Sequence, residues 1–265
     1  MSAPQTGGKL LIAVRYLGTN YCGYQVQPNG PTVQAELNAA AEALFGFPCD
    51  IVGCSRTDSG VHAECFCATV ARQGTDCLTT SIPTERIPRA FCRHLPPDIA
   101  VWAARWVPSS FHARYDVREK EYVYRIHNRH ERDPFLADRA WHVPAPIGDA
   151  QLAAMQAAAA QYVGTHDFAA FMAQGSSVTS TVRTVTRAEV AREGDLITFR
   201  VAADGFLYNM VRIMTGTLLA VAEGKCAPDE IAAMLASRDR AQAGITAPAC
   251  GLYLARVVYS PEYCI

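Results

Sequence analysis

Apolar positions in the first part of the chain alternate between strand-like and helical spacing. Short apolar or alternating runs predict strands, and apolar residues three and four positions apart between 33 and 44 predict an amphipathic helix. The predicted elements are, in order, strand 9–16, helix 31–45, strand 49–54, strand 65–70, helix 83–95 and strand 99–107. This β-α-β-β-α-β succession is typical of the ferredoxin-like split unit.

A similar rhythm returns in the second part of the chain. The pattern predicts strand 121–127, helix 150–163 with Asp149 as its cap, hairpin strands 182–191 and 196–203, helices 208–223 and 228–237, and strand 252–259. We therefore predict an α+β protein of two ferredoxin-like βαββαβ-type halves with mainly antiparallel sheets. The halves, residues 1–107 and 108–265, share no visible sequence identity, so the repetition is one of architecture.

The composition indicates a folded chain without a membrane span. Half of the 265 residues are apolar, 18% are charged and the net charge is −1, which excludes a disordered tail and a wholly basic nucleic-acid coat. The longest apolar stretch, 213–222, is interrupted by Thr and Gly and is too short to cross a bilayer. Residues 1–8 lack the apolar core of a signal sequence, so we expect a soluble, cytoplasmic protein.

The ten cysteines do not follow a metal or disulfide pattern. No pair has C-x-x-C spacing, and most of the cysteines lie in apolar runs, where a thiol behaves as a small hydrophobic group. We expect reduced, buried thiols. A zinc site on His62, Cys65 and Cys67 is a weak alternative, because one histidine beside Cys-x-Cys is not a structural zinc spacing. We therefore expect no metal.

Positive charge is concentrated between Ser81 and His130. This segment carries nine basic and five acidic residues, a net charge of +4, while the remainder of the chain carries −5. Such a concentration suits an anionic partner bound by one face, although a run of solvated surface charge explains the same count.

A polar segment, residues 53–63, joins two predicted core strands. It combines a carboxylate, Asp58, with a guanidinium, Arg56, and a glycine that permits close backbone approach. One interpretation is a simple turn shaped by Asp58 and Ser59. Another is a Ser–His–Asp triad of a loop serine with His62 and Asp58. Proximity along the chain does not produce triad geometry, however, and no G-x-S-x-G elbow is present.

Two further positions carry candidate chemistry. Alternation along the strand near residue 120 puts Lys120, Tyr122 and Tyr124 on one face. That face is either a platform that stacks a base and holds a phosphate, or the core side of an ordinary amphipathic strand. Arg212 lies near the start of an apolar helix, where its charge needs a partner or must reach solvent along its aliphatic stem.

The loop sequence Arg-Thr-Asp-x-Gly-Val-His-Ala resembles the catalytic motif of the tRNA pseudouridine synthase A family. Other segments resemble that family in the same order along nearly the whole chain: residues 19–25, Phe111-His112-Ala113-Arg114, Lys120-Glu121-Tyr122-Val123-Tyr124, Met210-Val211-Arg212 and Cys250-Gly251-Leu252-Tyr253-Leu254. Three positions depart from the family pattern. Tyr24 stands where Trp is frequent, Ser59 where Ala is common and Cys250 where Glu is usual.

The resemblance implies conversion of uridine to pseudouridine in the anticodon arm of tRNA, at tRNA positions 38, 39 and 40, in a catalytic cleft between the two halves. It implies that Asp58 is the catalytic carboxylate, acting as a nucleophile on C1′ or eliminating the base through a glycal. By the same resemblance, Arg212 forms an ion pair with Asp58, and Tyr122 stacks on the flipped base. Arg56 then fills the vacated space and contacts phosphates.

The resemblance also implies a homodimer that binds tRNA across both protomers, and a reaction without metal or cofactor. The basic segment from Arg86 to Arg129 suits salt-dependent RNA binding. Two other classes of protein stay open. One is a tRNA-binding protein of the same fold that has lost catalysis, and the other is a hydrolase that uses the serine, histidine and aspartate of the loop.

Overall fold

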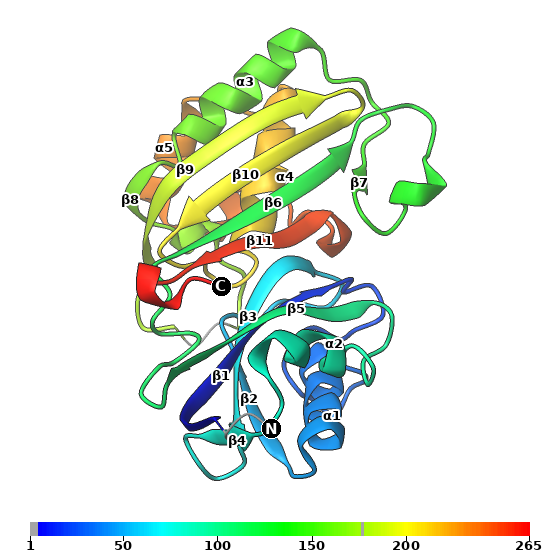
Figure 1. The fold of residues 1–265 in the computed structure, drawn as a ribbon. Helices are drawn as coiled ribbons and strands as arrows, with labels where there is room; N and C mark the ends of the chain where they lie inside the picture. Colours follow the sequence, from blue (N-terminus) through cyan, green and yellow to red (C-terminus); the bar gives the residue numbers. More distant parts are fainter. Residues whose placement is uncertain (1–4, 176–177) are drawn as a thin grey trace. The chain divides into compact units, whose positions relative to one another are not determined.

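The computed structural model describes residues 5–175 and 178–265, which form two compact units (Figure 1). The first unit extends to Arg118 and also takes in Leu254–Ile265, whereas the second comprises Glu119–Tyr253. The sequence prediction divides the chain earlier, after residue 107.

Packing explains where the first unit ends. Beyond its last central strand the chain stays with this unit, because the buried ring of Phe111 lies 5.1 Å from the ring of Tyr259, measured between centroids. The N–H of Arg118 then donates to the carbonyl of Val258 at 2.8 Å. These contacts join the segment before Arg118 to the C-terminal segment of the chain. Both segments therefore belong to the first unit.

The sheet of the first unit is built around one central strand. Its strands are β1 (Gln5–Tyr16), β2 (Cys49–Gly53), β3 (His62–Arg72), β4 (Leu78–Thr80) and β5 (Ile99–Pro108). β1 pairs antiparallel with β3 and β5, β2 extends the sheet beyond β3, and the short β4 pairs with the start of β1. The order β5-β1-β3-β2 matches the ferredoxin-like unit predicted from the sequence. β11 (Leu252–Val258), most of which belongs to this unit, neighbours β3.

Helix α1 (Val33–Phe45) follows the predicted pattern closely. Its first turn is capped by Thr32, whose hydroxyl accepts the N–H of Ala35 at 3.3 Å, and it ends at Gly46 in the left-handed conformation. α1 packs on β2 and on the second helix of this unit, α2 (Ile87–Phe91), which packs on β5. The two helices lie side by side in Figure 1.

The prediction of one helix over residues 83–95 is wrong in extent. The chain forms a 3₁₀ turn, Thr84–Arg86, and then the five-residue α2. Pro88 explains the division, because a proline is accommodated in the first turn of a helix and breaks its interior. The helix therefore begins next to Pro88 and ends at Phe91.

The strands of the second unit also pair mainly antiparallel. Its strands are β6 (Glu119–His127), β7 (Trp141–His142), β8 (Gly164–Asp167), β9 (Val182–Glu193) and β10 (Leu196–Ala203), in the order β6-β10-β9-β8. The predicted hairpin of β9 and β10 is confirmed, and the two-residue β7 pairs parallel to β6. β7 and β8 are too short to leave a pattern in the sequence, and neither was predicted.

Three helices cover one face of this sheet: α3 (Asp149–Ala160), α4 (Met210–Ala222) and α5 (Glu230–Ser237) (Figure 1). α4 packs on β6 and α3, and it is buried on nearly all sides. A Cβ at Gly216 would lie 1.9 Å from the carbonyl oxygen of Ile245, so only glycine lets the following segment run against α4. The cap predicted at Asp149 is wrong by one residue, because Gly148 is the N-cap of α3.

The prediction of an α+β protein with mainly antiparallel sheets is confirmed. Short 3₁₀ turns complete the structure at Pro134–Leu136, Ala169–Phe171, Arg240–Gln242, Ala249–Gly251 and Pro261–Tyr263. In the described part of the chain, every helix is too short or too polar to traverse a bilayer. The cleft predicted between the two halves stays a prediction.

Candidate active site

The polar segment from the sequence forms the loop between β2 and β3, which we call the aspartate loop (residues 54–61). A second loop, after β1, fastens it. The N–H of Tyr24 donates to the carbonyl of Thr57 at 3.1 Å, and the Ser59 hydroxyl donates to the carbonyl of Tyr21 at 3.2 Å. Two motifs about thirty residues apart, which the sequence showed only as separate segments, therefore support each other in space.

Thr57 is the anchor of the aspartate loop. Its side chain is buried, and its hydroxyl lies 2.8 Å from the hydroxyl of Tyr16 on β1. Gly23 passes close to it in the left-handed region, at φ +94°, where a Cβ would stand 2.6 Å from the Thr57 carbonyl oxygen. This close backbone contact requires glycine.

Asp58 follows the anchor directly and is half-buried. Its carbonyl accepts the N–H of Val61 at 3.1 Å, and Gly60 at φ +78° completes the turn. Because Thr57 is anchored on one side and this turn closes on the other, the backbone that carries the Asp58 carboxylate is held at both ends.

His62 and Ser59 have structural partners. His62 is fully buried, and its Nδ1 accepts the backbone N–H of Gly18 at 2.9 Å. The Ser59 hydroxyl is engaged by Tyr21, as described above. These contacts identify both side chains as supports of the loop. Among the described residues, His62 is not part of any group of three side chains that could hold a metal ion.

Arg56 occupies the outer side of the same loop. Its side chain is exposed, and no hydrogen bond or ion pair joins it to another residue in the described ranges. A guanidinium in this state keeps all of its donors available for an external acceptor such as a phosphate.

Tyr122 lies on β6 of the second unit, opposite Val201 of β10. The ring is 7% exposed and meets Phe206 edge to face, with 4.9 Å between centroids. Tyr124, two residues further, is completely buried and donates its hydroxyl to the carbonyl of Pro248 at 2.7 Å. Both tyrosines are buried, so the structure matches the interpretation of this strand face as the core side of an amphipathic strand, and the described residues of β6 form no exposed aromatic platform.

Arg212 lies in the first turn of α4, half-buried. Its Nε donates to the carbonyl of Ala247 at 2.7 Å, and its guanidinium also donates to Oδ1 of Asn209 at 2.8 Å. The helix N-terminus disfavours a cation by roughly 0.3–1 kcal/mol, so an anion near this guanidinium is stabilising there. The contacts contradict the interpretation of a side chain that simply reaches solvent.

The structure thus gathers Arg56 and Asp58 on one loop of the first unit. It places Tyr122 and Arg212 in the second unit, on β6 and on α4, which pack against each other. Sequence reasoning missed the supports of these residues: Tyr16, Thr57, Phe206 and Ala247. Only the tertiary contacts reveal these supporting residues, because the partners lie far apart in the sequence. Tyr16 and Thr57, for example, are 41 positions apart.

Residues 12–116 and 158–260 match the family model described as tRNA pseudouridine synthase. The chain belongs to the tRNA pseudouridine synthase family. It is 45% identical over 250 residues to tRNA pseudouridine synthase A of Thermoanaerobacter sp. (strain X514), covering 94% of this chain and 99% of that protein. The proteins of the same name from Acetivibrio thermocellus and Moorella thermoacetica are 43% and 44% identical, over 94% of this chain and 98% and 99% of theirs.

Membership of this family makes the chain an isomerase that acts on uridine in tRNA, which confirms the family and the activity class predicted from the sequence.

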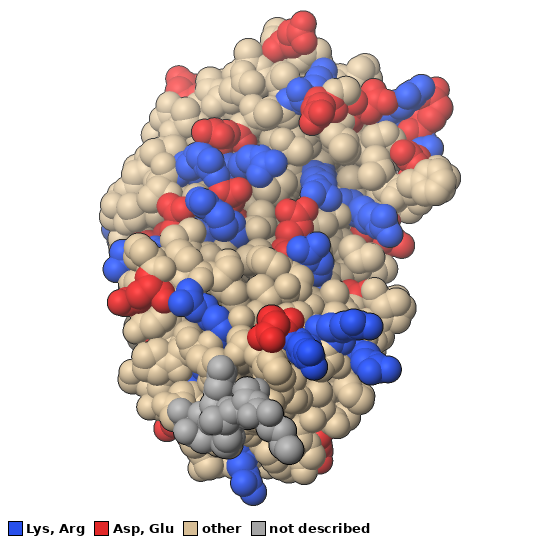
Figure 2. All heavy atoms as spheres, in the orientation of Figure 1, with Lys and Arg blue, Asp and Glu red and all other residues tan. Residues whose placement is uncertain are grey.

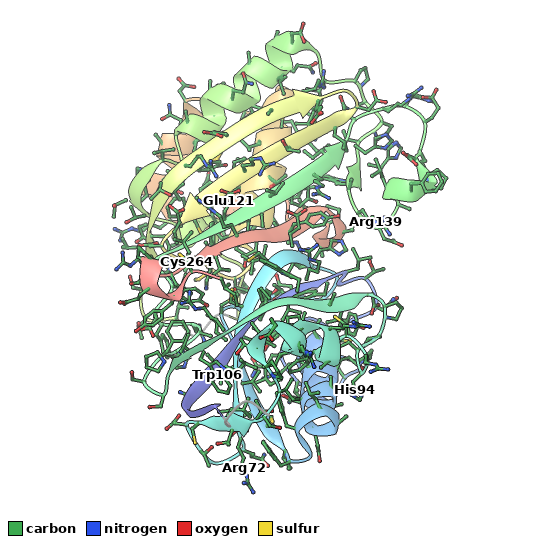
Figure 3. All side chains as sticks on the ribbon, in the orientation of Figure 1. Arg72, His94, Trp106, Glu121, Arg139 and Cys264 are labelled. Carbon is green, nitrogen blue, oxygen red and sulfur yellow. The ribbon has the colours of Figure 1, made fainter. Side chains whose placement is uncertain are left out.

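A charge cluster that the sequence did not reveal lies on the second unit of this tRNA-modifying enzyme. Glu121 on β6 is buried, yet its carboxylate is paired with Arg187 on β9 and, at 3.4 Å, with Arg200 on β10. Figure 3 labels Glu121 on the sheet, and Figure 2 shows basic side chains gathered over β9 and β10 with acidic ones among them. Glu121 thereby holds two half-exposed guanidinium groups in place on a face that can meet phosphates.

Cys250 begins the last of the segments that resemble the family. It lies in the 3₁₀ turn before β11, and its thiol contacts the carbonyl of Ala140 at 3.7 Å. Burial raises the pKa of this thiol, so it stays neutral. The next residue, Gly251, allows the Tyr124 ring to pack directly on the backbone, with 2.6 Å to a Cβ placed there.

Proposed function

We propose that this enzyme isomerises uridines on the 3′ side of the anticodon arm, at tRNA positions 38, 39 and 40, with Asp58 as the catalytic carboxylate. The observation that carries this proposal is the aspartate loop, whose backbone is fixed on both sides of Asp58 by Thr57 and by the turn at Gly60. A carboxylate that must approach one carbon atom of a sugar needs this preorganisation.

The chemistry requires an ionised carboxylate. Asp58 attacks C1′ as a nucleophile, or removes a proton so that the base leaves through a glycal; in either case the N1–C1′ bond breaks. The uracil then turns and C5 bonds to C1′, while the Asp58–C1′ bond breaks or, in the glycal route, Asp58 returns the proton to the sugar. N1 gains a proton and the C5 hydrogen passes to water. Side-chain groups suffice for every one of these steps.

Arg212 pairs with Asp58 in this proposal. Its guanidinium is half-buried at the N-terminus of α4, where the helix dipole favours a nearby anion. A carboxylate that is shielded from water remains ionised only beside such a cation. The role of Arg212 is therefore to keep Asp58 charged before the uridine arrives.

A uridine inside the anticodon arm must leave its stack to reach a carboxylate. Tyr122 receives the flipped base on its ring, whose orientation Phe206 fixes edge to face. Arg56, exposed on the same loop as Asp58, enters the space that the base vacates and contacts the neighbouring phosphates.

The partner of the enzyme is tRNA, met in the cytoplasm by a homodimer in which each protomer holds part of the molecule. The basic residues between Arg86 and Arg129 support this proposal, since Arg86, Arg89 and Arg93 are exposed around α2. In Figure 2, blue side chains also gather over that helix. Affinity for tRNA should consequently fall steeply with salt.

The test is tritium release from tRNA labelled at C5 of uridine, with the native protein and the Asp58→Ala variant compared. Pseudouridine formation forces that hydrogen into water, whereas RNA binding or ester hydrolysis leaves it in place. Release by the native protein alone supports the proposal. Release from tRNAs that carry a single uridine at position 38, 39 or 40 assigns the sites. Tight binding without release would instead indicate the catalytically inactive tRNA-binding protein.

A further inference from the structure

Three thiols of the first unit meet beneath the aspartate loop. All ten cysteines of the chain are thiols. Cys54, Cys65 and Cys67, here called the thiol cluster, lie at the end of β2 and along β3. The remaining cysteines are scattered over both units. The cluster therefore needs an explanation of its own.

The strand register brings two of these thiols together. β2 pairs with β3 so that Gly53 faces Ala68, and continuing this register places Cys54 directly opposite Cys67. The N–H of Cys54 donates to the carbonyl of Cys67 at 2.8 Å. In return, the N–H of Cys67 donates to Sγ of Cys54 at 3.4 Å, so this sulfur already lies against the backbone of the opposite cysteine.

This arrangement meets the distance requirement of a disulfide. Hydrogen-bonded opposite residues in an antiparallel pair have Cα atoms about 5.5 Å apart, inside the range of roughly 4.4–6.8 Å for disulfides. Cys65 and Cys67 are two residues apart on one strand, about 6.6 Å at a rise of about 3.3 Å per residue, which is near the upper limit. Cys54 and Cys67 are therefore the better pair to join.

Access to the cluster is through Cys65. Cys54 and Cys67 are completely buried, whereas Cys65 is partly exposed. The Cys67 thiol donates a hydrogen bond to the Cys65 sulfur, which lowers the pKa of Cys65 and raises that of Cys67; the N–H of Val257 and the charge of Arg15 lower the Cys65 pKa further. The accessible sulfur thus carries the thiolate.

We propose that the thiol cluster is a modification site, at which a hydroperoxide oxidises Cys65 and the resulting oxidation passes through Cys67 to a Cys54–Cys67 disulfide. The cluster is a poor candidate for a metal site, because no three metal-binding side chains among the described residues are arranged to hold an ion.

The relay has three balanced steps. The Cys65 thiolate attacks a peroxide oxygen, the O–O bond breaks, and sulfenic acid and hydroxide (or alkoxide) form, with two electrons passing from sulfur to the peroxide. The Cys67 sulfur attacks the Cys65 sulfur, and water leaves. The Cys54 sulfur then attacks Cys67 and expels Cys65 as a thiolate, which is the better leaving group. The net reaction joins two thiols and reduces one hydroperoxide to water and an alcohol or second water.

Oxidation at Cys54 acts on catalysis because Cys54 is the first residue of the aspartate loop. Bonding its sulfur to Cys67 breaks the hydrogen bond from the Cys67 N–H and pulls the start of a loop whose next fixed point is Thr57. Asp58 follows Thr57 directly, so its position shifts. This consequence rests on the proposed function, whereas the disulfide itself does not.

The experiment treats the full-length protein with hydrogen peroxide, blocks remaining thiols with N-ethylmaleimide and analyses tryptic fragments without reduction. Cleavage after Arg15, Arg56 and Arg72 separates Cys54, on fragment 16–56, from Cys65 and Cys67, on fragment 57–72. The expected product joins the two fragments, with fragment spectra that locate the bond at Cys54 and Cys67. Tritium release is expected to fall about tenfold and to recover with dithiothreitol.

Variants separate the steps. Cys65→Ser, at the partly exposed position, should slow disulfide formation about tenfold. Cys54→Ser should stop the relay at a bond within fragment 57–72. Cys67→Ala should leave Cys54 alkylated and Cys65 as the sulfenic acid, with no bond between the two fragments. The exposed Cys77→Ser is the matched control and should behave as the native protein.

Full alkylation of Cys54 and Cys67 after peroxide treatment would overturn the relay, as would a cross-link that forms equally fast in Cys65→Ser. The mass readout is independent of catalysis. If the disulfide forms but the untreated enzyme releases no tritium, the relay stands and the proposed function fails. If tritium is released but no disulfide forms, the proposed function stands and the relay fails.

Discussion

The aspartate loop and the Tyr122–Arg212 region of the second unit position functional side chains by different means. The loop has no regular secondary structure, and single hydrogen bonds to the segment after β1 hold it. Tyr122 and Arg212 lie instead on a paired strand and on a buried helix, where many contacts hold each residue in position. The comparison teaches that Asp58, the proposed catalytic residue, depends on a few long-range contacts, while Tyr122 and Arg212, its proposed assisting groups, take their positions from the core.

The largest expected effect comes from the loop itself. Asp58→Asn should reduce tritium release about a thousandfold or more, while the melting temperature changes little, because the side chain is half-buried and the loop is held by backbone contacts. Ser59→Ala is the matched control on the same loop and should keep most activity. Loss of tritium release in Ser59→Ala with full release in Asp58→Asn would remove Asp58 as the catalytic residue.

Arg212→Met tests the assisting region. Without the cation the carboxylate is harder to ionise, so turnover at neutral pH should fall about a hundredfold. The acid limb of the pH–rate profile should move to higher pH, and activity should partly return in alkaline buffer. Arg212→Lys keeps the charge and should shift the limb less. If the pH–rate profile of Arg212→Met is unchanged, the role of Arg212 is to hold Asn209 and the segment at Ala247 in place.

Two substitutions at Tyr122 distinguish base stacking by its ring from proton transfer by its hydroxyl. Tyr122→Ala should cost roughly 1–3 kcal/mol of transition-state stabilisation, because base–aromatic stacking contributes about that much. Tyr122→Phe keeps the ring and its edge contact with Phe206, so it should retain most activity. Equal losses in the two variants would assign a proton-transfer role to the hydroxyl. Tritium release at saturating tRNA measures both.

The smallest effect on chemistry, with a clear effect on stability, is expected from Gly23→Ala. The new Cβ meets the Thr57 carbonyl at 2.6 Å at a positive φ, which should destabilise the first unit by roughly 1–3 kcal/mol. Gly74→Ala is the matched control, because it has φ +75° but open space around its Cβ. Urea denaturation measures the difference. If Gly23→Ala and Gly74→Ala lose equal stability, the close contact with the Thr57 carbonyl is not the reason for glycine at position 23.

Elements with strong periodicity were predictable. Helix α1, the β9–β10 hairpin and the ferredoxin-like order of the first unit follow from local patterns, since apolar spacing and caps act over a few residues. The predicted helix over residues 83–95 was too long, because Pro88 fits only the first turn of a helix and so divides this segment. Alternation also grouped Tyr122 with Tyr124 correctly, but it said nothing about how deeply each is buried.

By itself, the sequence determined the family and most strands and helices, and it singled out the motif around Asp58, because these depend on residue type and local spacing. Only the tertiary structure decided which groups support Asp58, how Arg212 is held and that Cys54 faces Cys67. The physical reason is that such contacts join residues far apart in the chain. Strand register and close backbone approach bring them together, and neither leaves a periodic signal in the sequence.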